Sequence, residues 1–241
     1  MAKMTPEELV EQLRAAYGDA LRSVVLYGSA AAGEHIPKRS DYNVLVLVDS
    51  LSLDRLSAAG AVARAWSEGG NPAPMTLTTR EWRSSADIFA MEYADILERH
   101  KILYGEAPFD GIRVAPRDLR LQLEHEAMGK LLRLRQGVLA AGGDGRRQVE
   151  LLAASLSTIM VIFRAVIRLE GAAPATDNIA LSQAVARYAR FDSSPFERVV
   201  RHVRGEQTIA VGDVGSVVAG YLDGMEKLVE HLDRFEARAG E

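Results

Sequence analysis

Two short apolar runs near the start of this 241-residue chain enclose a turn of small residues and a polar loop. The first run, residues 24–27, leads into Gly28-Ser29, and the second, residues 44–48, follows the polar segment 40–43. Apolar runs of this length, bounded by turn residues, are typical of buried strands. We therefore expect a strand, a turn that begins a helix, a loop, and a second strand with acidic or polar groups on one face.

The residue types at the turn and at the second strand suggest a shared site. Gly28 lets a polyphosphate approach the backbone closely, and Ser29 adds a hydroxyl at a helix start whose N–H groups favour an anion. Asp41 could hold a divalent cation that bridges the same phosphates. Strand alternation places Asn43 on the same face as Asp41, with Tyr42 opposite. The same residues are also compatible with a plain tight turn at Gly28 and a cap at Asp41.

The stretch 23–49 resembles the signature of the nucleotidyltransferase superfold, the polymerase-beta-like family. In that signature a Gly-Ser pair precedes an Asp-x-Asp pattern flanked by apolar residues, and here Asp41 lies 12 positions after Ser29. Gly33-Glu34 resembles the Gly-Glu that often follows the Gly-Ser turn. Residues 103–105, Leu-Tyr-Gly, are similar to the end of such domains in bacterial small-molecule nucleotidyltransferases.

The resemblance implies transfer of a nucleoside monophosphate from a nucleoside triphosphate, such as ATP, to a hydroxyl or phosphate acceptor. It also implies two Mg²⁺ ions held by three carboxylates. Carried over to this chain, Gly28 and Ser29 hold phosphate and Asp41 is the first carboxylate. Asn43 stands where the second carboxylate is expected, so Asp41 and Asn43 are the candidate catalytic and metal-binding residues.

Three departures weaken a two-metal centre. Asn43 keeps an oxygen ligand but has no charge, the expected third strand at 75–79 contains no acid, and Ala32 stands where many members carry an arginine. Mg²⁺ relies on carboxylates and substrate phosphates, and two adjacent cations need several negative groups to offset their repulsion. We expect at most a single metal, held largely through the nucleotide.

Other charged residues could contribute to the site. Lys38 and Arg39, just before Asp41, are candidate nucleotide-binding residues or ordinary loop charges. The acids after the third strand could replace the missing carboxylate, but a solvated face of an amphipathic helix is the favoured interpretation; these acids are Glu81, Asp87, Glu92, Asp95 and Glu98. Asp49 is expected to lie beyond its strand and to cap the next helix.

The remaining pattern predicts an α/β (α+β) domain with a mixed sheet over residues 1–110 and an all-α helical bundle over residues 116–241. In the first domain we expect helices after Thr5, over 54–68 and over 86–100, with capping boxes at Thr5/Glu8 and Thr78/Glu81. Short strands are expected at 75–79 and 101–105. In the second domain the expected helices are 117–140, 146–169, 178–189, 196–203 and 214–237.

The composition of the chain limits the classes of partner that it is expected to bind. The net charge of −4 argues against nucleic acid as a partner. No apolar run approaches the roughly 20 residues of a membrane span, so no membrane association is expected. The chain has no cysteine, which fits a reducing cytoplasm. The apolar faces of the long C-terminal helices could serve one bundle or a homodimer.

Two functions follow from these observations. The first is a nucleotidyltransferase that uses Mg²⁺ and a nucleoside triphosphate to modify an unknown small-molecule or protein acceptor. The alternative is a catalytically degenerate relative that acts as a nucleotide-binding regulator or as a toxin–antitoxin component.

Overall fold

The computed structural model describes residues 4–31 and 42–235 of the chain. The chain divides into two compact units, Met1–Val114 and Ala115–Glu241. The first unit is built around a sheet, whereas the second is helical. The expected fold class, an α/β part with a mixed sheet followed by a helical bundle, is therefore confirmed.

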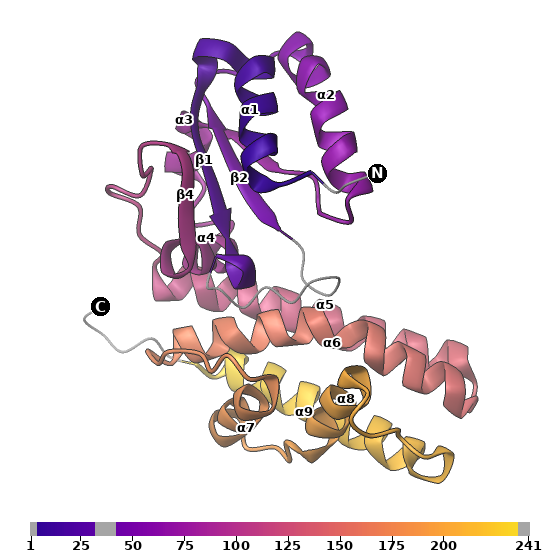
Figure 1. Ribbon diagram of the computed structural model, residues 1–241. Coiled ribbons are helices and arrows are strands. Elements are labelled where there is room, and N and C mark those ends of the chain that lie inside the picture. Colours follow the sequence, from indigo (N-terminus) through magenta and orange to yellow (C-terminus); the bar gives the residue numbers. More distant parts are fainter. Residues whose placement is uncertain (1–3, 32–41, 236–241) are drawn as a thin grey trace. The chain divides into compact units, whose positions relative to one another are not determined.

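In the described residues of the first unit, the sheet has four strands in the order β3-β2-β1-β4 (Figure 1). Strand β1 pairs antiparallel with β2 and with β4, while β2 and β3 run parallel. The strands are β1 (Leu21–Tyr27), β2 (Asn43–Val48), β3 (Met75–Thr78) and β4 (His100–Gly105). Because β1 ends at Tyr27, which pairs with Asn43 at the start of β2, the Gly28 turn and the start of β2 lie at the same end of the sheet.

Helices cover both faces of this sheet, and strand alternation sends β2 side chains to each. Val44, Val46 and Val48 pack with Trp66 in the cluster formed by α1 (Pro6–Tyr17) and α2 (Leu53–Glu68). Leu45 and Leu47 pack on the other face with α3 (Thr79–Ser84) and α4 (Ala90–Glu98). Full burial of each such side chain contributes roughly 1.5–3 kcal/mol. A one-residue slip in the pairing of β2 would move each of its side chains to the opposite face of the sheet. The burial of both faces therefore fixes the register of β2 and the position of Asn43.

Two helices in this unit begin at the predicted capping residues, whereas a third begins at a different one. Both predicted capping boxes are present, at Thr5/Glu8 and at Thr78/Glu81. The expectation that Asp49 caps α2 is wrong, because the Ser52 hydroxyl accepts from the Arg55 N–H at 3.3 Å. Asp49 instead forms a bidentate ion pair with Arg22 on β1.

Helix α4 begins at Ala90, four residues later than position 86, where it was expected. The N–H groups of Ile88 and Phe89 both bond to the Ser85 carbonyl, at 3.3 and 3.1 Å, and these bonds form a separate turn before the helix. Ile88 is 63% exposed, so its apolar side chain does not extend the buried stripe of α4.

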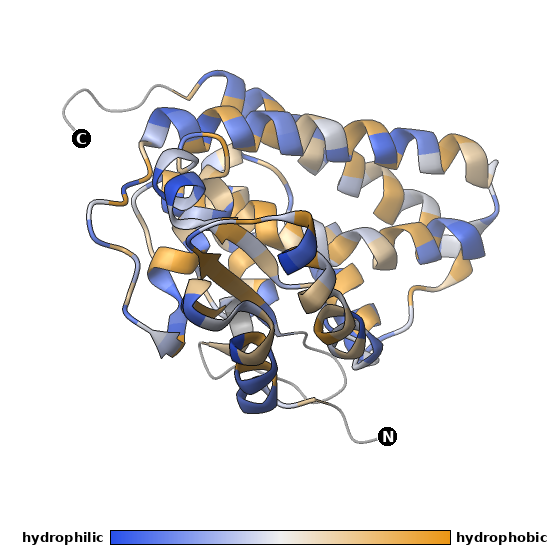
Figure 2. Cartoon of the chain, turned by 90° about the horizontal axis from the view of Figure 1, so that it is seen from above, coloured by the Kyte–Doolittle hydropathy of each residue, from blue (hydrophilic) through white to orange (hydrophobic). Residues whose placement is uncertain are grey.

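The second unit is a bundle of long helices with short connections. The long helices carry apolar and polar bands along their length (Figure 2), and the apolar positions include the fully buried Leu123, Phe163 and Leu228. The helices are α5 (Pro116–Ala141), α6 (Gly145–Leu169), α7 (Asn178–Ala189), α8 (Ser194–Arg204) and α9 (Val214–Asp233). Each lies within a few residues of its predicted range.

Helix α6 is long and apolar enough, by length and composition, to cross a membrane. The expectation that no apolar stretch approaches that length is therefore wrong. However, 56% of this stretch is buried inside the protein, and Ile159, Phe163 and Val166 belong to the core. The core helix of a bundle meets the same criterion, so this feature is weak support for a membrane span.

Candidate functional site

The turn after β1 requires glycine at its first position. Gly28 has a φ of +77°, in the left-handed region that other residues adopt only at a cost. Its N–H donates to the Arg99 carbonyl at 3.0 Å, and its own carbonyl accepts from the Ala31 N–H at 3.1 Å. The turn spans Gly28–Ala30, and the bond to Arg99 connects it to the residue that follows α4.

Asn43 lies beside this turn. It is the first residue of β2 and pairs with Tyr27, the residue before Gly28. Tyr42 lies on the opposite face, where its ring is 5.9 Å from that of Trp66, in agreement with the predicted alternation. A Cβ atom built on Gly28 would lie 3.4 Å from the Asn43 amide nitrogen and 3.5 Å from Asp95 Oδ2. The turn, the amide and a carboxylate from α4 therefore converge on one point.

The carboxylate of Asp95 is part of a half-buried ion pair. Arg99, one helical turn later, donates to Asp95 Oδ1 at 2.6 Å, and the two side chains are only 23% (Asp95) and 18% (Arg99) exposed. Glu92 is also partly buried, whereas Glu98 is exposed. The expectation of a solvated acidic face on this helix is therefore correct only for Glu98.

The electrostatics of Tyr27 indicate how much negative charge gathers here. Its pKa is raised from 10.0 to about 12, mainly because the phenol is buried and further because Glu92 and Asp95 lie nearby. Deprotonation would place a third negative charge in the same region. Tyr27 therefore stays neutral throughout the physiological range.

Replacing Asp95 with asparagine is expected to lower the pKa of Tyr27, because one of the nearby charges is removed. The value should stay above 10.0, since burial is the larger cause. An NMR titration of the tyrosine ring carbons measures this shift. Glu98→Gln, at the exposed end of the same helix, is the matched control and should leave Tyr27 unchanged. An unaltered Tyr27 titration in the Asp95 variant would show that the carboxylate is not close to the phenol.

The structure describes only part of the predicted site. Gly28 and Asn43 are brought together, and the backbone of Ser29 belongs to the turn. The Ser29 side chain lies outside the described residues, as do Lys38, Arg39 and Asp41, so their roles remain predictions. Sequence reasoning gave Asp95 too little weight. Its i, i+4 spacing to Arg99 was a usable signal of a structured pair.

The described residues do not complete a metal site by themselves. Within residues 4–31 and 42–235, no group of three or more His, Cys, Asp or Glu side chains could hold a metal ion. The polar side-chain atoms found beside Gly28 are the amide nitrogen of Asn43 and a carboxylate oxygen of Asp95, whose other oxygen accepts from Arg99. A divalent cation here would need further oxygens, from Asp41 and from the phosphates of a bound nucleotide.

Comparison with known proteins relates this architecture to solved structures. No family model and no curated protein sequence matches the chain. The crystal structure of spectinomycin adenyltransferase AAD(9) from Enterococcus faecialis with ATP and spectinomycin is similar, with a TM-score of 0.59 and 12% identity. The match covers 94% of this chain and 97% of that one.

A second solved structure, a toxin–antitoxin complex with AMP-PNP, is 19% identical, with a TM-score of 0.30, and covers 42% of this chain and 75% of that one. That score is too low to support an argument. The likeness to the adenyltransferase extends over nearly the whole of both chains, so it includes the sheet unit and the helical unit of this chain. The chain therefore has the nucleotidyltransferase fold.

Proposed function

We propose that this protein transfers a nucleoside monophosphate from a nucleoside triphosphate to a small-molecule or protein acceptor, with Mg²⁺, at the Gly28 end of the sheet. One observation carries the proposal. The left-handed Gly28 turn, the Asn43 amide and the Asp95 carboxylate meet within 3.5 Å of one point, and Gly28-Ser29 is the pair whose sequence resembles the Gly-Ser signature of nucleotidyltransferases. In the reaction, an acceptor oxygen bonds to the α-phosphorus and loses its proton, while pyrophosphate leaves.

The similar adenyltransferase supports a small-molecule acceptor over a protein. It was solved with both ATP and spectinomycin, and its match to this chain includes the helical unit as well as the sheet. A fold that holds ATP together with a small molecule is a suitable scaffold for the same class of reaction. The acceptor of this chain can still differ, because fold similarity at 12% identity carries no substrate specificity.

The proposed roles follow from the chemistry of each residue. Gly28 admits a phosphate close to the backbone, and Ser29, Lys38 and Arg39 donate hydrogen bonds to the phosphate oxygens. Asp41 and Asn43 provide oxygen ligands for Mg²⁺, which when bound neutralises phosphate charge. Because Asn43 carries no charge, the cation depends more on the nucleotide than it would beside two carboxylates.

The electrostatics of the described residues favour a cation requirement. Asp95 faces Gly28 with one oxygen, and Glu92 lies close enough to affect Tyr27. A triphosphate brought to this turn would meet these carboxylates and be repelled unless a positive charge lay between them. Arg99 donates to one of these carboxylates, at Asp95 Oδ1.

Turnover tests the proposal directly. The protein is incubated with each nucleoside triphosphate, Mg²⁺ and a panel of hydroxylated acceptors that includes spectinomycin, and pyrophosphate is measured together with the mass of the acceptor. We expect pyrophosphate release and a matching gain of one nucleotide on an acceptor or on the protein itself. Nucleotide binding without any such product would contradict transferase activity.

Asp95→Asn is expected to strengthen nucleotide binding in the absence of Mg²⁺ by about threefold to tenfold, because a negative charge near the phosphates is removed. With Mg²⁺ present the gain should shrink or reverse, since the same carboxylate then attracts the cation. Calorimetry under both conditions measures the difference, and Glu98→Gln again serves as the control. Equal changes with and without Mg²⁺ would show that Asp95 does not face the phosphates.

A nucleotide-binding regulator without catalysis is the second candidate, and a specific observation favours it. Asn43 replaces the expected carboxylate, and β3 (Met75–Thr78) contains no acid to take the third position. Such a protein could act alone or as a toxin–antitoxin component. It would bind a nucleoside triphosphate saturably and release no pyrophosphate with any acceptor.

A further inference from the structure

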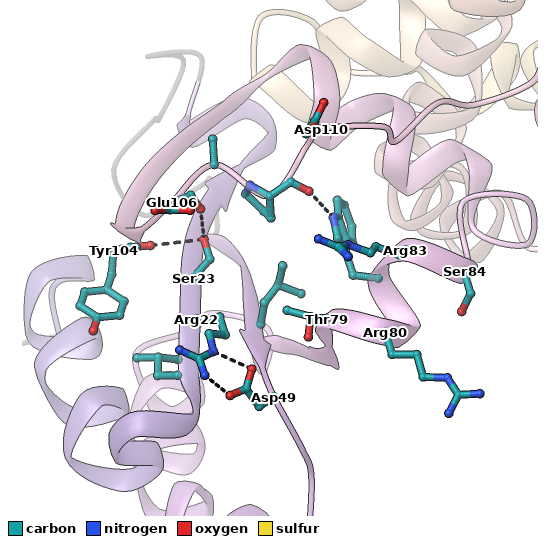
Figure 3. Close-up of a pocket in the computed structure, with 16 residues that line it drawn as sticks. Arg22, Ser23, Asp49, Thr79, Arg80, Arg83, Ser84, Tyr104, Glu106 and Asp110 are labelled. Atoms are coloured by element: carbon teal, nitrogen blue, oxygen red, sulfur yellow. Dashed lines mark hydrogen bonds and ion pairs between the residues drawn. The ribbon is translucent and has the colours of Figure 1, made fainter.

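A hollow lies in the first unit, at the end of the sheet opposite Gly28 (Figure 3). It has a volume of about 1070 Å³ and is formed where β1 begins, β2 ends and β4 ends. Because β1 runs from Leu21 to Tyr27, the hollow and the Gly28 turn are separated by roughly 20 Å. A ligand in this hollow would therefore be distinct from a nucleotide at Gly28.

The walls of this hollow are held in place by buried contacts. Trp82 of α3 is 1% exposed, stacks on Tyr93 at 4.1 Å between ring centroids, and donates its indole N–H to the Pro108 carbonyl at 2.7 Å. On the other side the buried Ser23 hydroxyl donates to the Glu106 backbone oxygen at 3.0 Å. The segment after β4 is thus fixed to both α3 and β1, and the hollow is a preformed feature.

The charges that line the hollow are balanced but only partly paired. Arg22 and Asp49 neutralise each other in a bidentate pair (Figure 3). The other charged lining residues, for which no ion pair within the described part of the chain is found, are two arginines on α3 (Arg80, Arg83) and two carboxylates after β4 (Glu106, Asp110). Figure 3 shows the Arg83 side chain directed toward the hollow, whereas Arg80 extends away from it.

From this arrangement we infer that the hollow is a second ligand site, for a small zwitterion such as a short peptide with free termini. A purely anionic ligand held by Arg83 would meet Glu106, and a purely cationic one would meet Arg83. A zwitterion satisfies both, with its carboxylate on Arg83 and its ammonium on Glu106. The apolar surface of Ala107 and Pro108, which line the hollow and are not buried, accepts the part of the ligand between its two charges.

Triglycine and its two end-blocked forms test this inference. Triglycine carries both charges, N-acetyl-triglycine only the negative one and triglycine amide only the positive one. The chain has two tryptophans, so NMR of the indole N–H groups reports on Trp82 beside the hollow and on Trp66 in the other core cluster as an internal control. No nucleotide is added, so the result is independent of the function proposed for the Gly28 end.

We expect triglycine, added up to about 20 mM, to shift the Trp82 signal saturably and to leave Trp66 unchanged. Each blocked form should bind about tenfold more weakly, and so should triglycine to Arg83→Gln or to Glu106→Gln. Arg64→Gln, an exposed arginine on α2, should bind triglycine as the unaltered protein does. The inference is overturned if triglycine leaves Trp82 unshifted, if all three peptides act equally, or if Arg83→Gln and Glu106→Gln both bind with unchanged affinity.

Discussion

Gly105→Ala is expected to lower the free energy of unfolding by about 3 kcal/mol or more, enough to unfold a marginally stable domain. A Cβ at this position would lie 1.9 Å from the backbone oxygen of Arg22 and 3.1 Å from Ser23 Cα. Neither atom belongs to a side chain that could move aside. The clash would separate β4 from β1 at the Ser23–Gly105 pair, next to the hollow. Denaturant unfolding followed by circular dichroism measures the loss.

Gly111→Ala separates the clash from the backbone strain. Gly111 has a φ of +74°, almost the same as the +76° of Gly105, but a Cβ there would meet nothing within 4 Å. The expected loss in the free energy of unfolding is then only the cost of holding alanine in the left-handed conformation, about 1–2 kcal/mol. If the two variants lost the same stability, the close approach of β4 to the Arg22 carbonyl would be refuted.

Asn43→Asp is expected to raise nucleotide affinity in the presence of Mg²⁺ by about tenfold or more, because a carboxylate binds the cation better than an amide does. Without Mg²⁺ the same variant should be less stable and should bind nucleotide more weakly. The new charge would lie near Asp95 and beside the Gly28 turn. Calorimetry with and without Mg²⁺ measures the affinities, and thermal unfolding measures the stability.

Asn43→Ala is the matched variant that removes the oxygen donor altogether. It should weaken Mg²⁺-dependent binding and leave Mg²⁺-free binding nearly unchanged. Should Asn43→Asp leave the Mg²⁺ dependence as it is in the unaltered protein, then residue 43 does not face the cation and the proposed role of this strand fails.

Much of the fold could be predicted from the sequence because its signals are local. The capping boxes at Thr5 and Thr78 start helices through contacts three residues apart. The alternation of Tyr42 and Asn43 follows from the two-residue period of a strand. Helix α6 is an exception, because a local apolar stretch of this length does not show whether a helix lies in a protein core or crosses a membrane.

The site was harder to predict because its parts meet only through pairing and packing. Nothing near Gly28 in the sequence indicates that β4 pairs with β1 and so brings the end of α4 to the turn. From the sequence alone, Asp95 was therefore expected to be a surface acid, although in the structure it faces Gly28 beside Asn43. For the same reason Asp49 was expected to cap a helix, whereas its partner is Arg22, 27 residues away on the neighbouring strand.

Titration of the protein with ATP and the other nucleoside triphosphates, with and without Mg²⁺, is the most direct test of nucleotide binding at the Gly28 end. We expect saturable binding of at least one of them, tighter with Mg²⁺. In Gly28→Asp, which adds a charge and a strained side chain at the turn, binding should be lost while the protein stays folded by circular dichroism. The absence of binding for every nucleotide under both conditions, or unchanged binding in folded Gly28→Asp, would contradict the account.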